Sequence, residues 1–205
     1  MRFVEVTLAA PPDRVAELEA FYAGKTGETT LRFEPGEGEP FYHFALLVPG
    51  DRFDAARAWA DARVELLGGV FDFEDWDAQA VYFLDPASNI VELIAHHGLE
   101  ENCHRGEFDP GEIVGLSELG LVGDREAFLR ELEGIGLELF RGTVQEPDRL
   151  AFVGERGRTF ILAPPGRGWL PTDRPAEPHP VEAVIDEPPA ELAVGPGRIA
   201  ARRRL

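Results

Sequence analysis

The sequence predicts an α+β fold of tandem βαβββ modules, which form a curved mixed sheet with the helices outside. Two observations support this prediction. Segments in which polar and apolar residues alternate, as they do in half-buried strands, are each followed by a segment with the apolar spacing of a helix. This order occurs three times between residue 3 and about residue 163, and further strand-like segments follow each predicted helix.

The first round of this pattern is the shortest. Val4, Val6 and Leu8 lie on one face of the strand that begins the chain. The two prolines that follow favour a helix start, and Gly24 favours the end of that helix. Only one further strand, at residues 29–33, is predicted before a polar turn, so the first module is abbreviated.

The second and third rounds contain every element of a βαβββ module. Asp51 is a suitable cap for the second helix, and Trp59 lies on its apolar face. The elements of the second round are predicted at residues 41–48, 51–67, 68–76, 80–84 and 90–95, and those of the third at residues 113–122, 124–136, 137–142, 149–155 and 158–164.

We therefore assign residues 1–100 to two paired modules and residues 111–165 to a third module. A single module cannot cover its own sheet, so the first two are expected to pair within residues 3–97 around a concave pocket. The remaining residues, 166–205, are rich in proline. They are predicted to form an extended arm, in which residues 181–185 add an edge strand.

The composition excludes several classes of partner. The chain has 38 acidic and 20 basic residues, and its net charge of -18 repels phosphate backbones and anionic membrane surfaces. Neither nucleic acid nor a membrane is therefore an expected partner. No apolar run approaches the roughly 20 residues of a membrane span and no signal peptide is visible, which predicts a cytoplasmic location. The single cysteine, Cys103, excludes an internal disulfide and a multi-cysteine metal site.

A histidine and a glutamate interrupt two otherwise apolar strands. Every second residue from Tyr42 onward is apolar and should face the helix, which leaves His43 pointing into the concavity. The same parity directs Glu92 to that face. A carboxylate between Ile90 and Ile94 costs several kcal/mol unless a cation or donor compensates it. The residues alone leave open a site role, a direct pair of His43 with Glu92, or a histidine bonded to a backbone carbonyl.

Two motifs resemble those of the vicinal oxygen chelate superfamily. This superfamily includes glyoxalase I, fosfomycin-resistance enzymes, the bleomycin-binding proteins that confer bleomycin resistance, and extradiol dioxygenases. The first is "PFYHFALLVP", residues 40–49, where the family often places a ligand histidine. The second is "VYFLDPASNIVELIAHH", residues 81–97, which resembles the family's aromatic strand, "DP" turn and "N-x-x-E-L" ending. The resemblance covers residues 3–97, and residues 113–163 by pattern alone.

The resemblance implies that His43 and Glu92 are ligands of a divalent metal ion, which a substrate would approach through paired oxygens. Glu5 occupies the slot of the third ligand, on the first strand of the preceding module. We therefore predict a metal site of Glu5, His43 and Glu92, a ligand set that suits Fe²⁺, Mn²⁺, Zn²⁺ or Ni²⁺. Glu5 or a bound water is the predicted catalytic base. Ser88 departs from the family pattern, because glycine is usual in that turn.

The third module offers an internal comparison. Glu118 falls in the slot that His43 occupies in the second module, but Phe160 or Ile161 stands where a counterpart of Glu92 is expected. Because one acid cannot hold a metal ion, we interpret this module as structural, or as a wall or a dimer surface, and Glu118 as a surface or hydrogen-bonded acid. A module without a partner in its own chain also predicts a homodimer.

Two functions follow from these predictions. The first is a glyoxalase- or dioxygenase-like, metal-dependent enzyme that acts on a small molecule through paired oxygens. The alternative is a binding protein of the same fold that holds a drug or another small aromatic or cationic compound without chemistry, and a cationic ligand would suit the acidic charge of the chain. Two tryptophans are given structural roles: Trp76 is expected to hold a loop in place, and Trp169 to pin the C-terminal arm.

Overall fold

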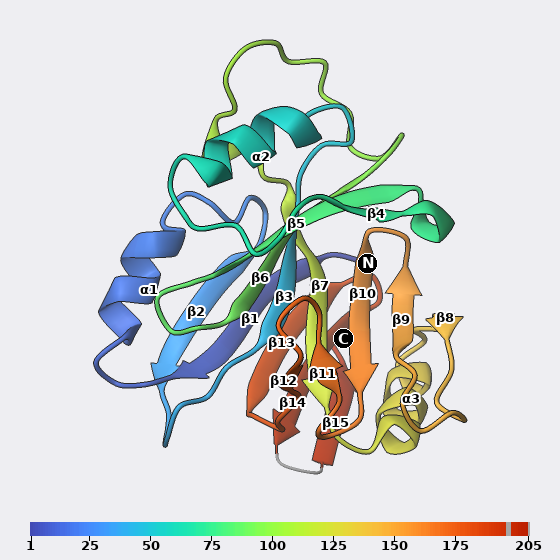
Figure 1. The fold of residues 1–205 in the computed structure, drawn as a ribbon. Helices are drawn as coiled ribbons and strands as arrows, with labels where there is room; N and C mark the ends of the chain where they lie inside the picture. The colour runs from blue at the N-terminus through green and yellow to red at the C-terminus, as the bar shows by residue number, and fades with distance from the viewer. Residues whose placement is uncertain (196–197, 205) are drawn as a thin grey trace.

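The fold combines two sheets and three helices in the part of the chain that the structure describes. The computed structural model describes residues 1–195 and 198–204, and the positions 196, 197 and 205 of the predicted arm lie outside this part. Eight strands form the larger sheet, five form the smaller one, and two more form a short hairpin (Figure 1). None of the helices in the described ranges is long and apolar enough to cross a membrane.

Two complete βαβββ modules make up the eight-stranded sheet, which curls around a concave face. The order of its strands is β4-β5-β6-β3-β7-β10-β9-β8. The second module contains β3 (His43–Leu47), α2 (Phe53–Asp61), β4 (Phe71–Phe73), β5 (Ala78–Leu84) and β6 (Ile90–His96). The third contains β7 (Gly115–Val122), α3 (Arg125–Gly134), β8 (Leu139–Gly142), β9 (Ala151–Glu155) and β10 (Arg158–Ala163).

The modules that pair are the second and third, which corrects the expected pairing within residues 3–97. Strand β3 runs parallel to β6 on one side and antiparallel to β7 on the other. Both of its edges are therefore occupied within this sheet, and no edge is left for the first module. The third module therefore has a partner in its own chain and does not need a second copy to pair with, and the homodimer stays an untested prediction.

The first module belongs to the five-stranded sheet instead. Its parallel strands β1 (Phe3–Ala10) and β2 (Thr30–Pro35) are connected through α1 (Val15–Tyr22). The sheet is completed by the C-terminal strands, in the order β15-β14-β13-β1-β2. These strands are β13 (Val181–Asp186), β14 (Pro189–Gly195) and β15 (Arg198–Arg203).

The described C-terminal residues are therefore not an extended arm, and this expectation is corrected. Val181, Ala183 and Ile185 are buried while Glu182 between them is exposed, the alternation of a strand with one face in the core. A strand was expected at residues 181–185, and β13 confirms it. It lies inside the sheet between β1 and β14, however, and not at an edge.

The two sheets pack face to face through apolar side chains. The core joins Phe3 of β1 and Ile185 of β13 to Phe44 and Phe160 of the larger sheet. The rings of Phe3 and Phe160 meet edge to face with centroids 5.0 Å apart. The smaller sheet and the helices α2 and α3 thus cover the convex face of the larger sheet, and the concave face remains available for a ligand.

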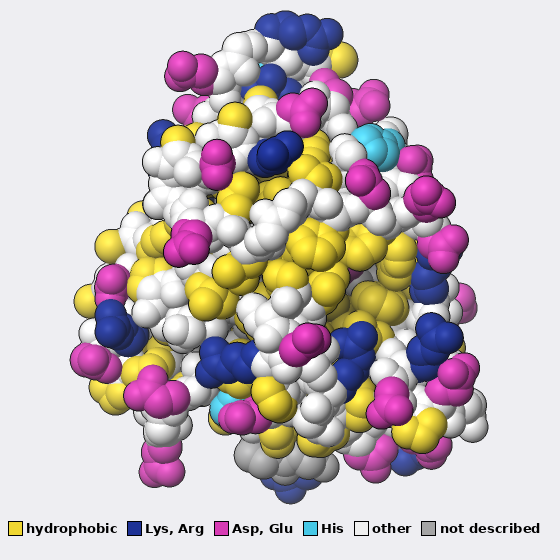
Figure 2. All heavy atoms as spheres, in the orientation of Figure 1, with side chains coloured by type: hydrophobic (Ala, Val, Ile, Leu, Met, Phe, Trp, Pro, Cys, Tyr) yellow, Lys and Arg dark blue, Asp and Glu magenta, His cyan; other side chains and the backbone are white. Residues whose placement is uncertain are grey.

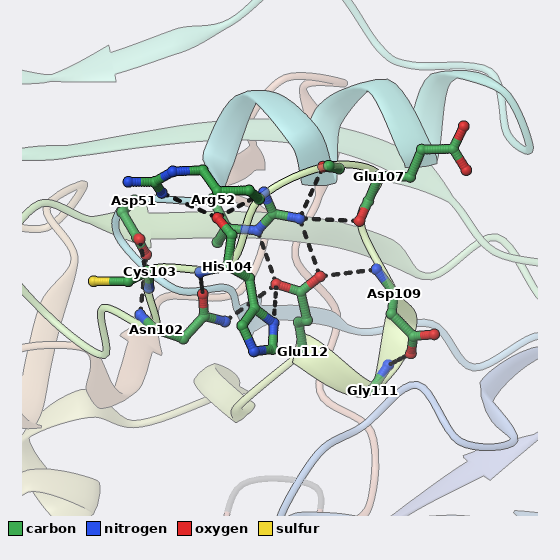
Figure 3. Close-up of polar contacts among 11 residues, drawn as sticks. Asp51, Arg52, Asn102, Cys103, His104, Glu107, Asp109, Gly111 and Glu112 are labelled. Atoms are coloured by element: carbon green, nitrogen blue, oxygen red, sulfur yellow. Dashed lines mark hydrogen bonds and ion pairs between the residues drawn. The ribbon is translucent and has the colours of Figure 1, made fainter.

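The connection between the two modules is held by a buried ion pair. Arg52, at the start of α2, donates through Nε to Glu112 Oε2 at 2.8 Å and through Nη2 to Glu112 Oε1 at 3.1 Å. Its Nη2 also donates to the carbonyls of Gly106 and Glu107. Figure 3 shows how Arg52 and Glu112 lie at the centre of this network. The network fixes the course of the loop that leads into β7.

The Arg52–Glu112 pair should stabilise the fold in a pH-dependent way. The hydrogen bond from Arg52 lowers the pKa of Glu112 to about 2. Because the folded pKa is depressed, the contribution is present above the usual carboxyl pKa of 4.5 and is lost as the pH falls toward 2. We expect Glu112→Gln to lower the free energy of unfolding by about 3 kcal/mol at pH 7, as removal of one partner of a buried pair does.

Urea unfolding at pH 7 and pH 3 tests this prediction. The difference between wild type and Glu112→Gln should shrink at pH 3, because Glu112 is then protonated in the unfolded chain and still largely ionised in the folded chain, which favours unfolding. Glu146→Gln is the matched control, because Glu146 pairs with Arg149 at an exposed site and should contribute less than about 1 kcal/mol. Equal, small effects of both substitutions at pH 7 would contradict a stabilising role for the buried pair.

Candidate functional site

A cavity of about 200 Å³ opens on the concave face of the larger sheet. Most of its lining is aromatic or aliphatic, and includes Trp76, Phe152 and Trp169. Figure 2 shows hydrophobic side chains gathered in a hollow on this face of the molecule. Among the described residues, the charged or titratable groups of the lining, other than Tyr82, are His43, Glu92, Glu118 and Arg167.

Three of these polar residues form a compact cluster. His43 comes from β3, Glu92 from β6 and Glu118 from β7, the strands on either side of β3. Both glutamates are in register with Ala45, two residues beyond His43, so all three side chains project from the same face. Each offers one ligand atom, and these atoms lie within 4.8 Å of one another. The register of the paired strands and the curvature of the sheet thus bring together residues that are far apart in the sequence.

The imidazole of His43 is held in one orientation by the backbone. Its Nδ1 lies 3.1 Å from the carbonyl oxygen of Ile90. Nδ1–H donates to this oxygen in the neutral ring, which leaves the lone pair on Nε2, 3.6 Å from Glu92 Oε2. Burial lowers the pKa of His43 to about 4. At neutral pH the ring is therefore neutral, the form in which histidine binds a metal ion.

The two glutamates are buried together, and their charges oppose each other. Burial raises the pKa of Glu118 to about 7. Burial also raises the pKa of Glu92 well above its usual range, and the nearby charge of Glu118 adds to this rise. Two carboxylates in such a site cannot both ionise at low cost unless a cation compensates them. One imidazole nitrogen and two carboxylates fit a divalent transition-metal ion such as Fe²⁺, Mn²⁺, Zn²⁺ or Ni²⁺.

Glu5 does not belong to this cluster. It lies on β1 in the smaller sheet, where its side chain is 39% exposed and pairs with Arg32 on β2 at 2.9 Å. The structure brings His43 and Glu92 together but places Glu118 beside them in the position expected for Glu5. The physical reason is the pairing of modules: the first strand next to β3 is β7, which carries Glu118, and not β1.

The interpretation of Glu118 as a surface or hydrogen-bonded acid is therefore corrected. Glu118 is buried and lines the cavity. The sequence contained a signal for this placement, because Glu118 occupies the same slot of its module as His43. Of the two residues that stand in place of a counterpart of Glu92 in the third module, Ile161 lines the cavity while Phe160 faces the core between the sheets. The cluster thus has three ligand residues, and the apolar side chain of Ile161 lies where a fourth would be expected.

Two functional candidates escaped the sequence reasoning, and both come from the C-terminal hairpin of β11 (Gly168–Trp169) and β12 (Arg174–Pro175). Trp169 lies over His43, with ring centroids 4.9 Å apart. Arg167 also lines the cavity, so the hairpin brings a cation to the site. No local pattern indicates that a short hairpin beyond the modules folds back over the concave face.

A scan of the sequence against protein-family models finds no match, and neither does a search of the curated proteins. Solved structures do match. A dioxygenase candidate from Bacillus subtilis subsp. subtilis strain 168 superposes with a TM-score of 0.54 and 16% identity, over 97% of this chain and 68% of that chain. Glyoxalase I from Zea mays superposes with a TM-score of 0.54 and 12% identity, over 98% of this chain and 91% of that chain. At these identities the likeness is one of fold.

Proposed function

We propose that this chain, which has the fold of the vicinal oxygen chelate superfamily, is a glyoxalase- or dioxygenase-like enzyme that depends on a divalent metal ion. His43, Glu92 and Glu118 would hold the ion, and a small molecule would approach it through paired oxygens. One observation carries the proposal: three buried side chains offer ligand atoms within 4.8 Å of one another in the cavity of the concave face.

The surroundings of the three residues support a metal site over a merely structural cluster. His43 already presents Nε2 because the Ile90 carbonyl fixes Nδ1–H. When both glutamates are ionised they need a positive charge in direct contact, and in the described ranges neither forms an ion pair with an arginine or lysine. Three donors also leave coordination positions for a substrate, as catalytic metal sites do.

A bound ion would act as a Lewis acid toward the oxygens of the substrate. The protein's own residues have separate tasks. Trp76, Phe152 and Trp169 form walls that exclude water and contact the apolar part of a ligand. Within the described lining, His43, Glu92 and Glu118 are the residues with an imidazole or a carboxyl group. A proton released by the substrate would therefore pass to one of these groups or to water, and not to Glu5.

The metal content of the purified protein tests the proposal. Protein prepared without chelator, or titrated with Mn²⁺, should bind about one equivalent of a divalent ion. The ligands bind in deprotonated form, so the affinity should fall as the pH decreases below 7, near the raised pKa of Glu118. At a free metal concentration of 100 times Kd, the ion should stabilise the fold by about 2.7 kcal/mol. Elemental analysis, calorimetric titration and melting with and without chelator measure these effects.

A protein that carries no ion and does not change its melting temperature with Mn²⁺, Fe²⁺, Zn²⁺ or Ni²⁺ would contradict the proposal. The second candidate function would then lead: a small-molecule binding protein that performs no chemistry. The aromatic lining of the cavity favours this alternative, because flat apolar walls bind aromatic compounds with or without a metal ion.

A further inference from the structure

The C-terminal hairpin that covers the cavity is docked at defined positions. Arg174 donates through Nη1 to the Ser88 carbonyl at 2.9 Å and stacks on the ring of Phe41. Trp169 reaches the sheet at Gly120, where a Cβ atom would lie 3.0 Å from the indole Cη2. The glycine therefore leaves the space that the indole occupies. The hairpin is a fixed part of the cavity wall, and so is Arg167 within it.

Arg167 is half-buried and forms no ion pair with a carboxylate of the described residues. Its Nε donates to the Asp148 carbonyl at 3.3 Å and its Nη1 to the Gly168 carbonyl at 2.8 Å, while Nη2 makes no hydrogen bond to a described residue. Arg158, by contrast, pairs with two carboxylates. Arg125 also has only carbonyl partners, but both of its terminal nitrogens are used.

The charges of the cavity favour an anionic ligand. A divalent ion would balance the two carboxylates of Glu92 and Glu118, and Arg167 would keep a positive charge that the nearby Asp148 offsets only in part, without an ion pair. Burial lowers the pKa of Arg167, so its guanidinium has lost part of its hydration. A planar guanidinium with a free nitrogen suits a carboxylate, with which it forms a charge-assisted hydrogen bond.

The walls and the size of the cavity limit the rest of the ligand. Trp76, Phe152 and Trp169 offer flat apolar surfaces that suit a planar ring. The volume of about 200 Å³ lies below the roughly 300–1,000 Å³ that is typical of sites for drug-sized ligands. A compact molecule with a single ring is therefore the matching size.

We infer that Arg167 selects a small aromatic acid, whose carboxylate contacts the guanidinium while its ring lies among the tryptophans and its paired oxygens face His43, Glu92 and Glu118. This inference rests on the proposed function, since the direction of the paired oxygens depends on a metal ion held by these three residues. Arg167 is a specificity-determining residue in this arrangement, supplied by the hairpin beyond the βαβββ modules.

Two pairs of matched probes test the inference by calorimetry on the full chain loaded with Mn²⁺. The first pair is 3,4-dihydroxybenzoate and 3,4-dihydroxybenzamide, which share their vicinal oxygens and differ in charge. The second pair is benzoate and benzamide, which lack those oxygens. Wild type should bind each acid about tenfold or more tightly than its amide, the effect of a hydrogen bond between charged groups.

Arg167→Gln should bind each acid no more tightly than its amide, with unchanged affinity for Mn²⁺ and for 3,4-dihydroxybenzamide. Arg167→Lys keeps the charge and should retain part of the preference. Arg130→Gln is the matched control for the loss of one arginine, because Arg130 is exposed on α3 and does not line the cavity, and it should keep the wild-type preference. These comparisons separate charge recognition from damage to the hairpin.

The outcomes also separate the two proposals. If wild type binds Mn²⁺ but shows no preference for the acids, or if Arg167→Gln keeps the preference, the inference about Arg167 is overturned and the proposed function stands. If wild type does not bind Mn²⁺, the proposed function fails, and benzoate against benzamide decides the role of Arg167. A preference for benzoate that Arg167→Gln abolishes would support anion recognition by Arg167, and equal binding would overturn it.

Discussion

Replacement of Glu118 by glutamine should lower the affinity for a divalent metal ion at least about 100-fold, while the same replacement at Glu5 should leave it unchanged. Glu118 supplies one of three ligand atoms, and its loss exceeds the roughly 10- to 100-fold effect of removing a group that only supports a ligand. Glu5 lies in the other sheet and pairs with Arg32. Calorimetric titration with Mn²⁺ and elemental analysis of both variants measure the difference.

The pH dependence of the metal-free protein gives a second readout for Glu118. Burial raises its pKa from the usual 4.5 to about 7, so the folded chain holds a proton that the unfolded chain releases in this range. The stability of metal-free wild type should therefore fall as the pH rises from about 4.5 to 7. The stability of metal-free Glu118→Gln should fall less over the same pH range. The melting temperature of this variant should not change when chelator is added.

Retention of stoichiometric metal by Glu118→Gln would show that other residues hold the ion. Loss of metal from Glu5→Gln would show that the smaller sheet contributes to the site, which would contradict the position of Glu5 in the structure. Both variants preserve the size of the side chain and remove one negative charge, so the comparison holds the change in net charge constant.

Replacement of Ile185 by aspartate should abolish stable folding of the whole chain, with a loss of more than about 4 kcal/mol. Ile185 is 1% exposed and lies between the two sheets. Its truncation alone would cost about 2–5 kcal/mol, and a buried unpaired carboxylate adds to that cost. A loss of this size is a large part of the 5–15 kcal/mol that is typical of a folded domain.

Glu182→Gln is the matched control, because Glu182 lies on the same strand and points to solvent. When unfolding in urea is monitored by circular dichroism, Glu182→Gln should have the same midpoint as wild type. If Ile185→Asp unfolds at the same midpoint as this control, the smaller sheet would not be part of the cooperative unit. The experiment thus tests whether the C-terminal strands belong to the core or only lie against it.

The sequence allowed the local elements of the second and third modules to be predicted, but not the way the modules pair. Alternation along a strand decides which face His43 and Glu92 share, because the side-chain period is two residues. Nothing in that period says whether the strand beside β3 comes from an earlier or a later module. Glu5 and Glu118 occupy equivalent slots, and only the long-range contact between β3 and β7 distinguishes them.

Of the C-terminal strands, β14 and β15 were not predicted, because the many prolines of residues 166–205 favour an extended arm over a sheet. Pro180 immediately precedes β13, and Pro188 and Pro189 lie at the turn into β14, positions where a strand tolerates proline. Between them, Glu182 and Glu191 are exposed while their neighbours are buried, which is a strand pattern. Arg167 and Trp169 carried no such signal, since their role depends on where the hairpin folds back.

The pairing of β1 with β13 also sets an order of events during synthesis. Arg2 bonds to Asp186, 184 residues further along the chain, so the smaller sheet cannot close until its last strands leave the ribosome. The second and third modules can fold before that moment. At roughly 5–20 residues per second, the roughly 40 residues from the end of β10 to the end of β15 require about 2–8 s of translation. During this interval the part of the convex face that the smaller sheet will cover is bare, and its apolar side chains are available to chaperones and to other unfinished chains.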